Sequence, residues 1–278
     1  MTTRRSVSGV WSSWPLDRHR LLLLAVAIVG SVGLFAAVGS LMTALLAPNP
    51  VTRFDVEIAG RFAANRTPTG DDLAHWGSLL ADTSVKIGVT AVFAMVAFAA
   101  WRRWHETVYL AVTLIFEATV FIIVTTIIDR PRPDVLRLED SPVNSSFPSG
   151  HVAAATVYGA FVVIVFWHTR ARSARALAIV VYAGVVGAVG WARLYQGMHF
   201  ASDVATGVVL GLWSLTVCLV VLGRPDRDDR TSASGSSQGE LQGERGADPV
   251  AEQRVDDPEV PREGAVADEA VAGRLYRP

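Results

Sequence analysis

Six apolar runs occupy most of the first 222 residues, and each is close to the roughly 20 residues that a helix needs to cross a bilayer core. They are residues 21–47, 85–101, 107–128, 152–167, 176–191 and 204–222. Only 18% of the chain is charged, whereas soluble domains have about 25%. The sequence therefore predicts an all-α fold, a six-transmembrane helix bundle over residues 21–222.

The two ends of the chain differ from this body. Residues 223–278 carry 13 acidic and 8 basic residues, whereas residues 1–222 carry 13 acidic and 17 basic ones. We expect residues 223–278 to be a disordered acidic tail, because a segment this polar cannot bury enough apolar surface to offset the entropy lost on ordering. With one lysine (Lys86) and one cysteine (Cys218), the chain lacks the basic tract of a nucleic-acid binder and the cysteines of a disulfide scaffold.

Arginines predict the orientation of the spans, because cytoplasmic loops of membrane proteins are enriched in them. With six spans, four arginine-rich segments fall on one side. They contain Arg4, Arg5, Arg18 and Arg20; Arg102 and Arg103; Arg170, Arg172 and Arg175; and Arg224, Arg227 and Arg230. We therefore expect a multi-pass protein of the cell membrane whose N-terminal segment 1–20 and C-terminal tail 223–278 are both cytoplasmic.

Three segments then face outward. Residues 48–84 have Leu73, Trp76, Leu79 and Leu80 at helical spacing, which predicts an amphipathic extracytoplasmic helical segment along the membrane surface. The other two, 129–151 and 192–203, concentrate polar residues at the outer ends of spans. Ionisable groups are costly at such positions and often mark function.

The first polar segment reads Asp-Arg-Pro-Arg-Pro over 129–133 and ends in Pro-Ser-Gly-His over 148–151. Gly150 and His151 are predicted to open a helix, whose free N–H groups and positive end form an anion site. Pro148 suits the first helical position because it has no N–H to leave unpaired. Arg132, with Arg193 from the other segment, supplies a permanently charged fork that fits phosphate oxygens.

The second polar segment contains Arg193, His199 and Asp203. If the sixth helix already begins near His199, His199 and Asp203 lie on one helix face, and the aspartate can hold one imidazole nitrogen. The other nitrogen is then a nucleophile or base, with His151 as the complementary acid. Each motif alone could be a helix cap or a charged loop, but together they predict a phosphoryl-transfer site that needs no metal and no cofactor.

These residues resemble the type 2 phosphatidic acid phosphatase superfamily, which includes bacterial membrane lipid phosphatases. Its signature is Lys-x6-Arg-Pro, then Pro-Ser-Gly-His, then Ser-Arg-x5-His-x3-Asp. The chain has Arg132-Pro133, the complete second motif at 148–151, and the third from Arg193 to Asp203. The motifs thus span 125–203.

The resemblance implies a role for each matching residue. His199 would form a phosphohistidine with Asp203 orienting it, and His151 would protonate the leaving oxygen. Arg132 and Arg193, with Ser149 and the backbone N–H of Gly150, would surround the phosphoryl oxygens; we call these four residues the phosphate cradle.

Two positions depart from the signature. Thr125 replaces the lysine and Ala192 replaces the serine before Arg193. The lost lysine removes a positive charge, which Arg130 in the same loop, or else Lys86, could supply by binding the phosphate. Glu117, in the middle of the third span, is either a polar floor or proton relay, or a structural carboxyl bonded to a neighbouring helix.

An outward site at headgroup level predicts an integral membrane lipid phosphatase. Its expected substrate is a lipid phosphomonoester or a polyprenyl pyrophosphate, such as phosphatidic acid, phosphatidylglycerol phosphate or undecaprenyl pyrophosphate. Two alternatives remain open: a phosphotransferase on the same scaffold, and a non-catalytic protein that binds anionic membrane lipids. The sequence leaves the oligomeric state undetermined.

Overall fold

The computed structural model describes residues 14–44, 50–141 and 144–224. In these residues the secondary structure is helical and contains no strand, as the sequence predicts. Six stretches of helix are long and apolar enough to cross a membrane. They are α2 (Arg18–Ala44), α5 (Thr83–Trp101), α6 (Trp104–Ile127), α7 with α8 (Gly150–Val157 and Gly159–His168), α9 (Arg172–Tyr195) and α10 (Ala201–Leu222).

The six-span prediction is confirmed, and two details differ from it. The fourth span is two helices, because the α-helix is interrupted at Tyr158. The fifth span extends four residues beyond the predicted run at each end. The predicted tail lies outside the described residues apart from Gly223 and Arg224.

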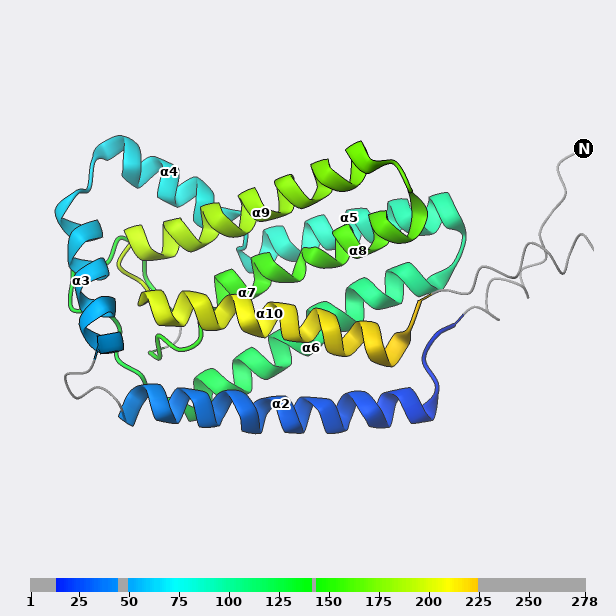
Figure 1. Cartoon of the computed structure of the whole chain (residues 1–278), viewed down its shortest axis with the longest axis horizontal. Coiled ribbons are helices and arrows are strands. Elements are labelled where there is room, and N and C mark those ends of the chain that lie inside the picture. The colour runs from blue at the N-terminus through cyan, green and yellow to red at the C-terminus, as the bar shows by residue number, and fades with distance from the viewer. Residues whose placement is uncertain (1–13, 45–49, 142–143, 225–278) are drawn as a thin grey trace, which may run out of the picture. The chain divides into compact units, whose positions relative to one another are not determined.

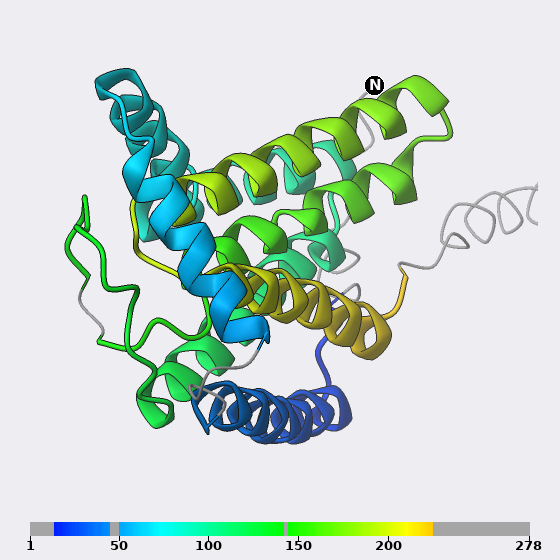
Figure 2. The same cartoon turned by 60° about the vertical axis from the view of Figure 1, so that its left-hand side comes forward.

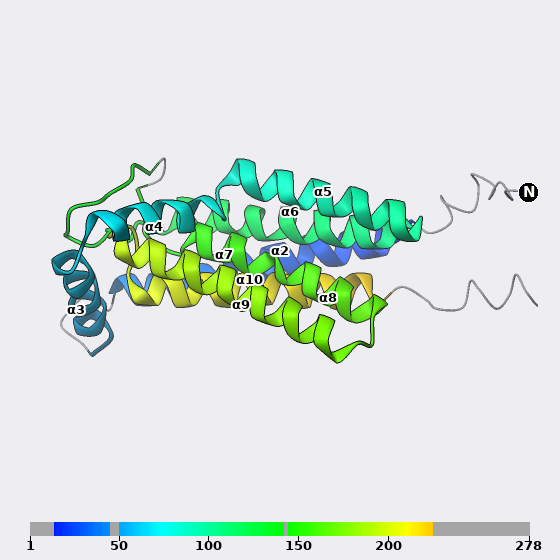
Figure 3. The ribbon, with the colours of Figure 1, turned by 90° about the horizontal axis from the view of Figure 1, so that it is seen from above.

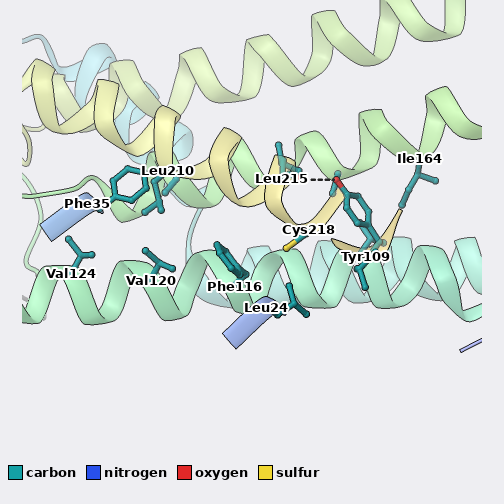
Figure 4. Close-up of a cluster of buried hydrophobic side chains, with 14 of the residues drawn as sticks. Leu24, Phe35, Tyr109, Phe116, Val120, Val124, Ile164, Leu210, Leu215 and Cys218 are labelled. Atoms are coloured by element: carbon teal, nitrogen blue, oxygen red, sulfur yellow. Dashed lines mark hydrogen bonds between the residues drawn. The ribbon is translucent and has the colours of Figure 1, made fainter. Parts of the chain in front are cut away.

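The core of the bundle lies where α6, α10, α2 and α8 meet, and Figure 4 shows its side chains. Phe116, Val120 and Leu210 are almost completely buried there. Glycines on α10 let it approach α7 closely: a Cβ on Gly207 would lie 2.6 Å from the carbonyl oxygen of Ser149. Small residues commonly permit such contact between membrane helices, and here the contact places the start of α7 beside the start of α10.

The outside of the bundle carries large apolar side chains. Val29, Ile115 and Val220 are between 63% and 75% exposed. Such exposure would be unfavourable in water, whereas lipid tails accept it. The distribution of apolar residues is therefore that of a bundle surrounded by hydrocarbon.

The segment between the first two spans forms two helices, α3 (Pro50–Ala64) and α4 (Pro68–Leu79). The helix α3 lies across the end of the bundle, whereas α4 packs against α9 (Figures 1, 2 and 3). On α4 the small residues Ala74 and Gly77 are buried while Leu73 and Trp76 are more than half exposed. The predicted helical segment is thus confirmed, and large apolar side chains of α4 face away from the bundle. Its position along the outer membrane surface stays a prediction.

One end of the bundle carries the start of α2 and the end of α10, and the opposite end carries α3, α4 and the loop between α6 and α7 (Figure 1). Every residue of the three predicted motifs lies in helices or loops at this second end. The arginines of the predicted cytoplasmic side that the structure describes lie in segments at the first end.

Candidate active site

His199 lies in the short connection between α9 and α10, and its side chain is 4% exposed. Its Nδ1 is 2.7 Å from the backbone carbonyl oxygen of Ser146, a residue of the loop between α6 and α7. Because a carbonyl oxygen only accepts hydrogen bonds, Nδ1 must carry the proton of the neutral ring. The lone pair of the ring is then on Nε2, the nitrogen that a nucleophile would use.

Neighbouring charges act on the protonation of His199. Burial and the positive charges of Arg193 and Arg132 hold its pKa well below 6.5, against the opposing effect of the bond to Ser146. A protonated His151 lowers this pKa as well. Three residues predicted to share a site with His199 are therefore close enough to interact with it electrostatically.

Asp203 lies at the start of α10, and its bonds differ from the predicted ones. Helix α10 begins at Ala201, so His199 precedes the helix and the two residues are not stacked on one helical face. One carboxylate oxygen of Asp203 accepts from the backbone N–H of Phe200 at 2.9 Å, and the other pairs with Nη1 of Arg130. The aspartate thus caps α10, and the acceptor for Nδ1 of His199 is Ser146.

Arg130 has partners that the sequence did not predict. Its guanidinium is 2% exposed and lies between two carboxylates, those of Asp203 and Asp55, with Nη2 at 2.9 Å from Oδ2 of Asp55. Nη1 also donates to the hydroxyl of Ser202 at 2.9 Å. Both of its terminal nitrogens are thus bonded to buried groups, whereas its Nε is buried without a partner among the described residues. These bonds favour a structural role for Arg130 over the predicted contact with phosphate.

Asp55 is a residue of this network that sequence reasoning missed. It comes from α3, is 1% exposed, and accepts from the backbone N–H of Ser202 at 2.9 Å as well as from Arg130. The helix across the end of the bundle is thereby tied to the start of α10. In the sequence Asp55 looks like the neighbouring solvated charges of an amphipathic helix, so no local signal distinguishes it.

Arg132 lies two residues after Arg130 but has different partners. Its Nη2 donates to Ser141 Oγ at 2.7 Å and to the carbonyl of Ser145 at 3.0 Å, and its Nη1 donates to the carbonyl of Met198. Burial together with the charges of Arg193 and Arg137 lowers the pKa of Arg132 to about 10. The residue therefore remains charged at neutral pH and joins the loop before α7 to the residue preceding His199.

Arg193, in the last turn of α9, is 3% exposed. Its Nη1 has three acceptors: Ser78 Oγ at 2.8 Å, Glu139 Oε2 at 2.7 Å and Gln196 Oε1 at 3.1 Å. Its Nε is buried and has no hydrogen-bond partner among the described residues. Sequence reasoning missed Ser78, Glu139 and Gln196, since they come from three separate segments.

The start of α7 agrees with the predicted helix opening at Gly150. Ser149 is the residue before the helix, and its hydroxyl is buried without a hydrogen-bond partner in the described chain. Pro148 therefore precedes the cap and does not occupy the first helical position. A Cβ on Gly150 would lie 2.5 Å from Phe121 Cζ, so a larger residue here would require the ring of Phe121 to move.

The residues around the missing lysine are also described. Thr125 is 9% exposed and its hydroxyl is buried without a partner among the described residues. It borders an open polar recess of about 400 Å³ whose wall includes Asp129 and Ser145. Nζ of Lys86 lies 3.5 Å from Oε2 of Glu117. Glu117 is therefore bonded to the neighbouring helix α5, and Lys86 is engaged in this ion pair.

A buried nucleophile candidate, two guanidinium groups, an unbonded hydroxyl and a helix start thus gather at one end of the bundle. Such an arrangement can bind a phosphoryl group and stabilise charge on it. In the described residues, no group of three or more His, Cys, Asp or Glu side chains is placed to hold a metal ion.

Part of the chain is similar to known membrane phosphatases. Phosphatidylglycerophosphatase B of Bacillus subtilis (strain 168) is 39% identical over 87 residues, 31% of this chain and 42% of that protein, so the match spans less than half of the relative. The crystal structure of the first transmembrane PAP2 type phosphatidylglycerolphosphate phosphatase from Bacillus subtilis superposes with a TM-score of 0.62 at 22% identity, covering 71% of this chain and 97% of that one, and supports the fold. The family model of the PAP2 superfamily matches residues 106–227, which contain all three motifs, and this part of the chain is similar to the PAP2 superfamily.

Proposed function

We propose that the protein is a membrane lipid phosphatase that works through a phosphohistidine on His199. The observation that carries the proposal is the bond from Nδ1 of His199 to the carbonyl of Ser146. It leaves Nε2 unprotonated beside Arg132 and Arg193, whose charges lower the pKa of the ring. A neutral imidazole next to fixed cations combines a nucleophile with an anion site.

The reaction would proceed in two balanced steps. First, Nε2 of His199 attacks phosphorus, the P–O bond to the lipid breaks, and His151 gives a proton to the leaving alkoxide, so that the lipid alcohol departs. Second, water attacks the phosphohistidine, His151 takes one of its protons, and the P–N bond breaks to release inorganic phosphate. Arg132, Arg193 and Ser149 would stabilise the phosphoryl oxygens throughout.

The position of the site favours a lipid substrate. The cradle lies at the end of a bundle whose sides expose apolar residues, so a phosphate could bind at headgroup level while its acyl or prenyl chain stays in the membrane. The matched Bacillus protein is named for phosphatidylglycerophosphate. We therefore propose phosphatidylglycerol phosphate as the first substrate to test, followed by phosphatidic acid and undecaprenyl pyrophosphate.

Phosphate release from these three lipids and from a soluble ester, in detergent with and without EDTA, tests the proposal. We expect release from a lipid substrate in both conditions, loss of release in His199→Ala, and wild-type release in His19→Ala, an exposed histidine at the opposite end of the bundle. Acid-labile, alkali-stable labelling from a ³²P substrate would support the phosphohistidine. Transfer to an added alcohol without phosphate release would indicate the phosphotransferase, and no turnover of any substrate would indicate a lipid-binding protein.

We also propose that the active site is extracytoplasmic and both termini are cytoplasmic, because the arginine-rich segments lie at the other end of the bundle. Cys218 is the only cysteine and is buried, so single-cysteine variants report on sidedness. In a Cys218→Ala background, we expect Arg61→Cys to react with an impermeant maleimide on intact cells. The exposed Arg172→Cys should react only after permeabilisation.

A further inference from the structure

Glu139 is an acidic residue that the proposed reaction does not use, although it contacts the phosphate cradle. It lies in the loop between α6 and α7 and is 28% exposed at its side chain. Its Oε2 is 2.7 Å from Nη1 of Arg193, and its Oε1 accepts from Nε2 of Gln196 at 2.8 Å. Glu139 is therefore separated from the site of His199 by one guanidinium group.

The contacts of Glu139 determine which edge of Arg193 remains available. Glu139, Ser78 and Gln196 all accept from the same nitrogen, Nη1, whereas Nε has no partner among the described residues. A phosphoryl oxygen that binds Arg193 at Nε leaves the pair with Glu139 intact. The carboxylate therefore stays beside Arg193 when a substrate binds, and its negative charge acts on that substrate.

Two other basic residues at this end of the bundle could have offset the negative charge of Glu139, but each is already paired with an acidic residue. Arg130 is paired with Asp55 and Asp203, and Lys86 is paired with Glu117. Thr125, at the position of the signature lysine, carries no charge. The positive charge available to a phosphate is thus lower than the number of basic residues at this end of the bundle suggests.

The carboxylate of Glu139 repels substrates of different charge to different extents. A phosphomonoester carries about −2 at neutral pH, and a diphosphate ester carries one more negative charge at most. Repulsion by Glu139 grows with the charge of the substrate, and in a partly buried site it is only partly screened. Arg132 and Arg193 attract the more highly charged substrate more strongly, and Glu139 opposes that attraction, so its charge disfavours the diphosphate relative to a site that lacks it.

We propose that Glu139 is a specificity-determining residue: by pairing with Arg193 it lowers the positive charge of the phosphate cradle, and it thereby shifts the preference of the site from a lipid diphosphate toward a lipid phosphomonoester. This inference rests on the phosphatase activity proposed above. It concerns a residue outside the three motifs and divides the candidate substrates into two classes.

Farnesyl monophosphate and farnesyl diphosphate test it, because they share one lipid chain and differ in charge. The measurement is kcat/KM for phosphate release from each, in one detergent, and the ratio of the two values. We expect Glu139→Gln, which keeps the oxygen that accepts from Arg193, to shift the ratio from its wild-type value toward the diphosphate by about fivefold or more. The matched control is Asp140→Asn, which removes the same charge from the next residue, an exposed one, and should shift the ratio by less than about twofold.

A second variant and a second measurement test the proposal even if Glu139→Gln fails to fold. His75 is 61% exposed and its Nδ1 is 3.8 Å from Oε1 of Glu139, so His75→Lys places a cation against the carboxylate without disturbing the interior. It should shift the ratio in the same direction. Orthovanadate, an anionic phosphate analogue, should inhibit Glu139→Gln at lower concentration than the wild type, whereas a merely disordered site would bind it more weakly.

The possible outcomes separate the two proposals. A ratio that responds to Glu139→Gln and His75→Lys no more than to Asp140→Asn overturns the role of Glu139 and leaves the phosphatase intact. A wild type that releases phosphate from neither compound nor from the lipids tested above overturns both proposals.

Discussion

Replacing Arg130 with alanine distinguishes a structural cation from a phosphate ligand. The substitution leaves the carboxylates of Asp55 and Asp203 buried without their shared partner. Removing one member of a buried ion pair typically costs about 3–5 kcal/mol. For a body of this size each kcal/mol lowers the melting temperature by about 2–4 °C, so we expect a fall of roughly 6–20 °C.

The assay is thermal unfolding in detergent, followed by tryptophan fluorescence, beside the inhibition constant for orthovanadate measured below the melting temperature of the variant. A lost charged hydrogen bond to the phosphate analogue would weaken inhibition about ten- to a hundredfold, whereas we expect a change no larger than about threefold. Arg53→Ala is the matched control, since Arg53 is an exposed arginine of α3 two residues from Asp55, and its melting temperature should stay within about 2 °C of wild type.

Asp55→Asn should give a smaller loss than Arg130→Ala, because the amide keeps one acceptor oxygen and Arg130 keeps Asp203. A double-mutant cycle between the two positions should show coupling of about 0.5–3 kcal/mol. An Arg130→Ala variant with the melting temperature of the wild type and vanadate inhibition weakened tenfold or more would refute this reasoning and return Arg130 to the cradle.

Three further predictions concern the catalytic end of the bundle. His199 has a pKa well below 6.5 in the folded protein, so its acidic limb in the pH profile of kcat/KM should lie below pH 6.5. Stability should fall as the pH drops through 6.5, because the histidine of the unfolded chain then binds a proton that the folded protein does not. An Arg132→Gln variant should move the acidic limb to higher pH, and an unmoved limb would contradict the electrostatic argument. Ser149→Ala removes a hydroxyl that has no partner in the described chain, so kcat/KM should fall about tenfold while the melting temperature barely changes; a large loss of melting temperature would show that the hydroxyl has a structural role. Gly150→Ala places a Cβ 2.5 Å from Phe121 Cζ and should cost about 1–3 kcal/mol in unfolding free energy, and Phe121→Leu in the same chain should recover part of it if this contact is the cause.

Lengths of apolar sequence were enough to predict the spans, because a bilayer core requires about 20 apolar residues wherever a helix crosses it. The interruption at Tyr158 was not predictable, since the apolar run continues through it without a break. The residues of the three motifs could be named from spacing alone. Their geometry could not, and the assumption that α10 already begins near His199 was wrong, because the helix starts at Ala201.

Arg130 and Arg132 show where sequence reasoning ends. They are two residues apart in one loop and were both expected at the phosphate, yet Arg130 is bonded to carboxylates of α3 and α10 whereas Arg132 reaches the loops around His199. The sequence by itself determined the membrane-spanning fold and the set of chemically capable residues, since both follow from local composition and spacing. Only the tertiary structure decided which carboxylate neutralises which cation, because the partner of a buried charge comes from segments such as Asp55 and Glu139 that are distant in the chain and carry no local mark of that role.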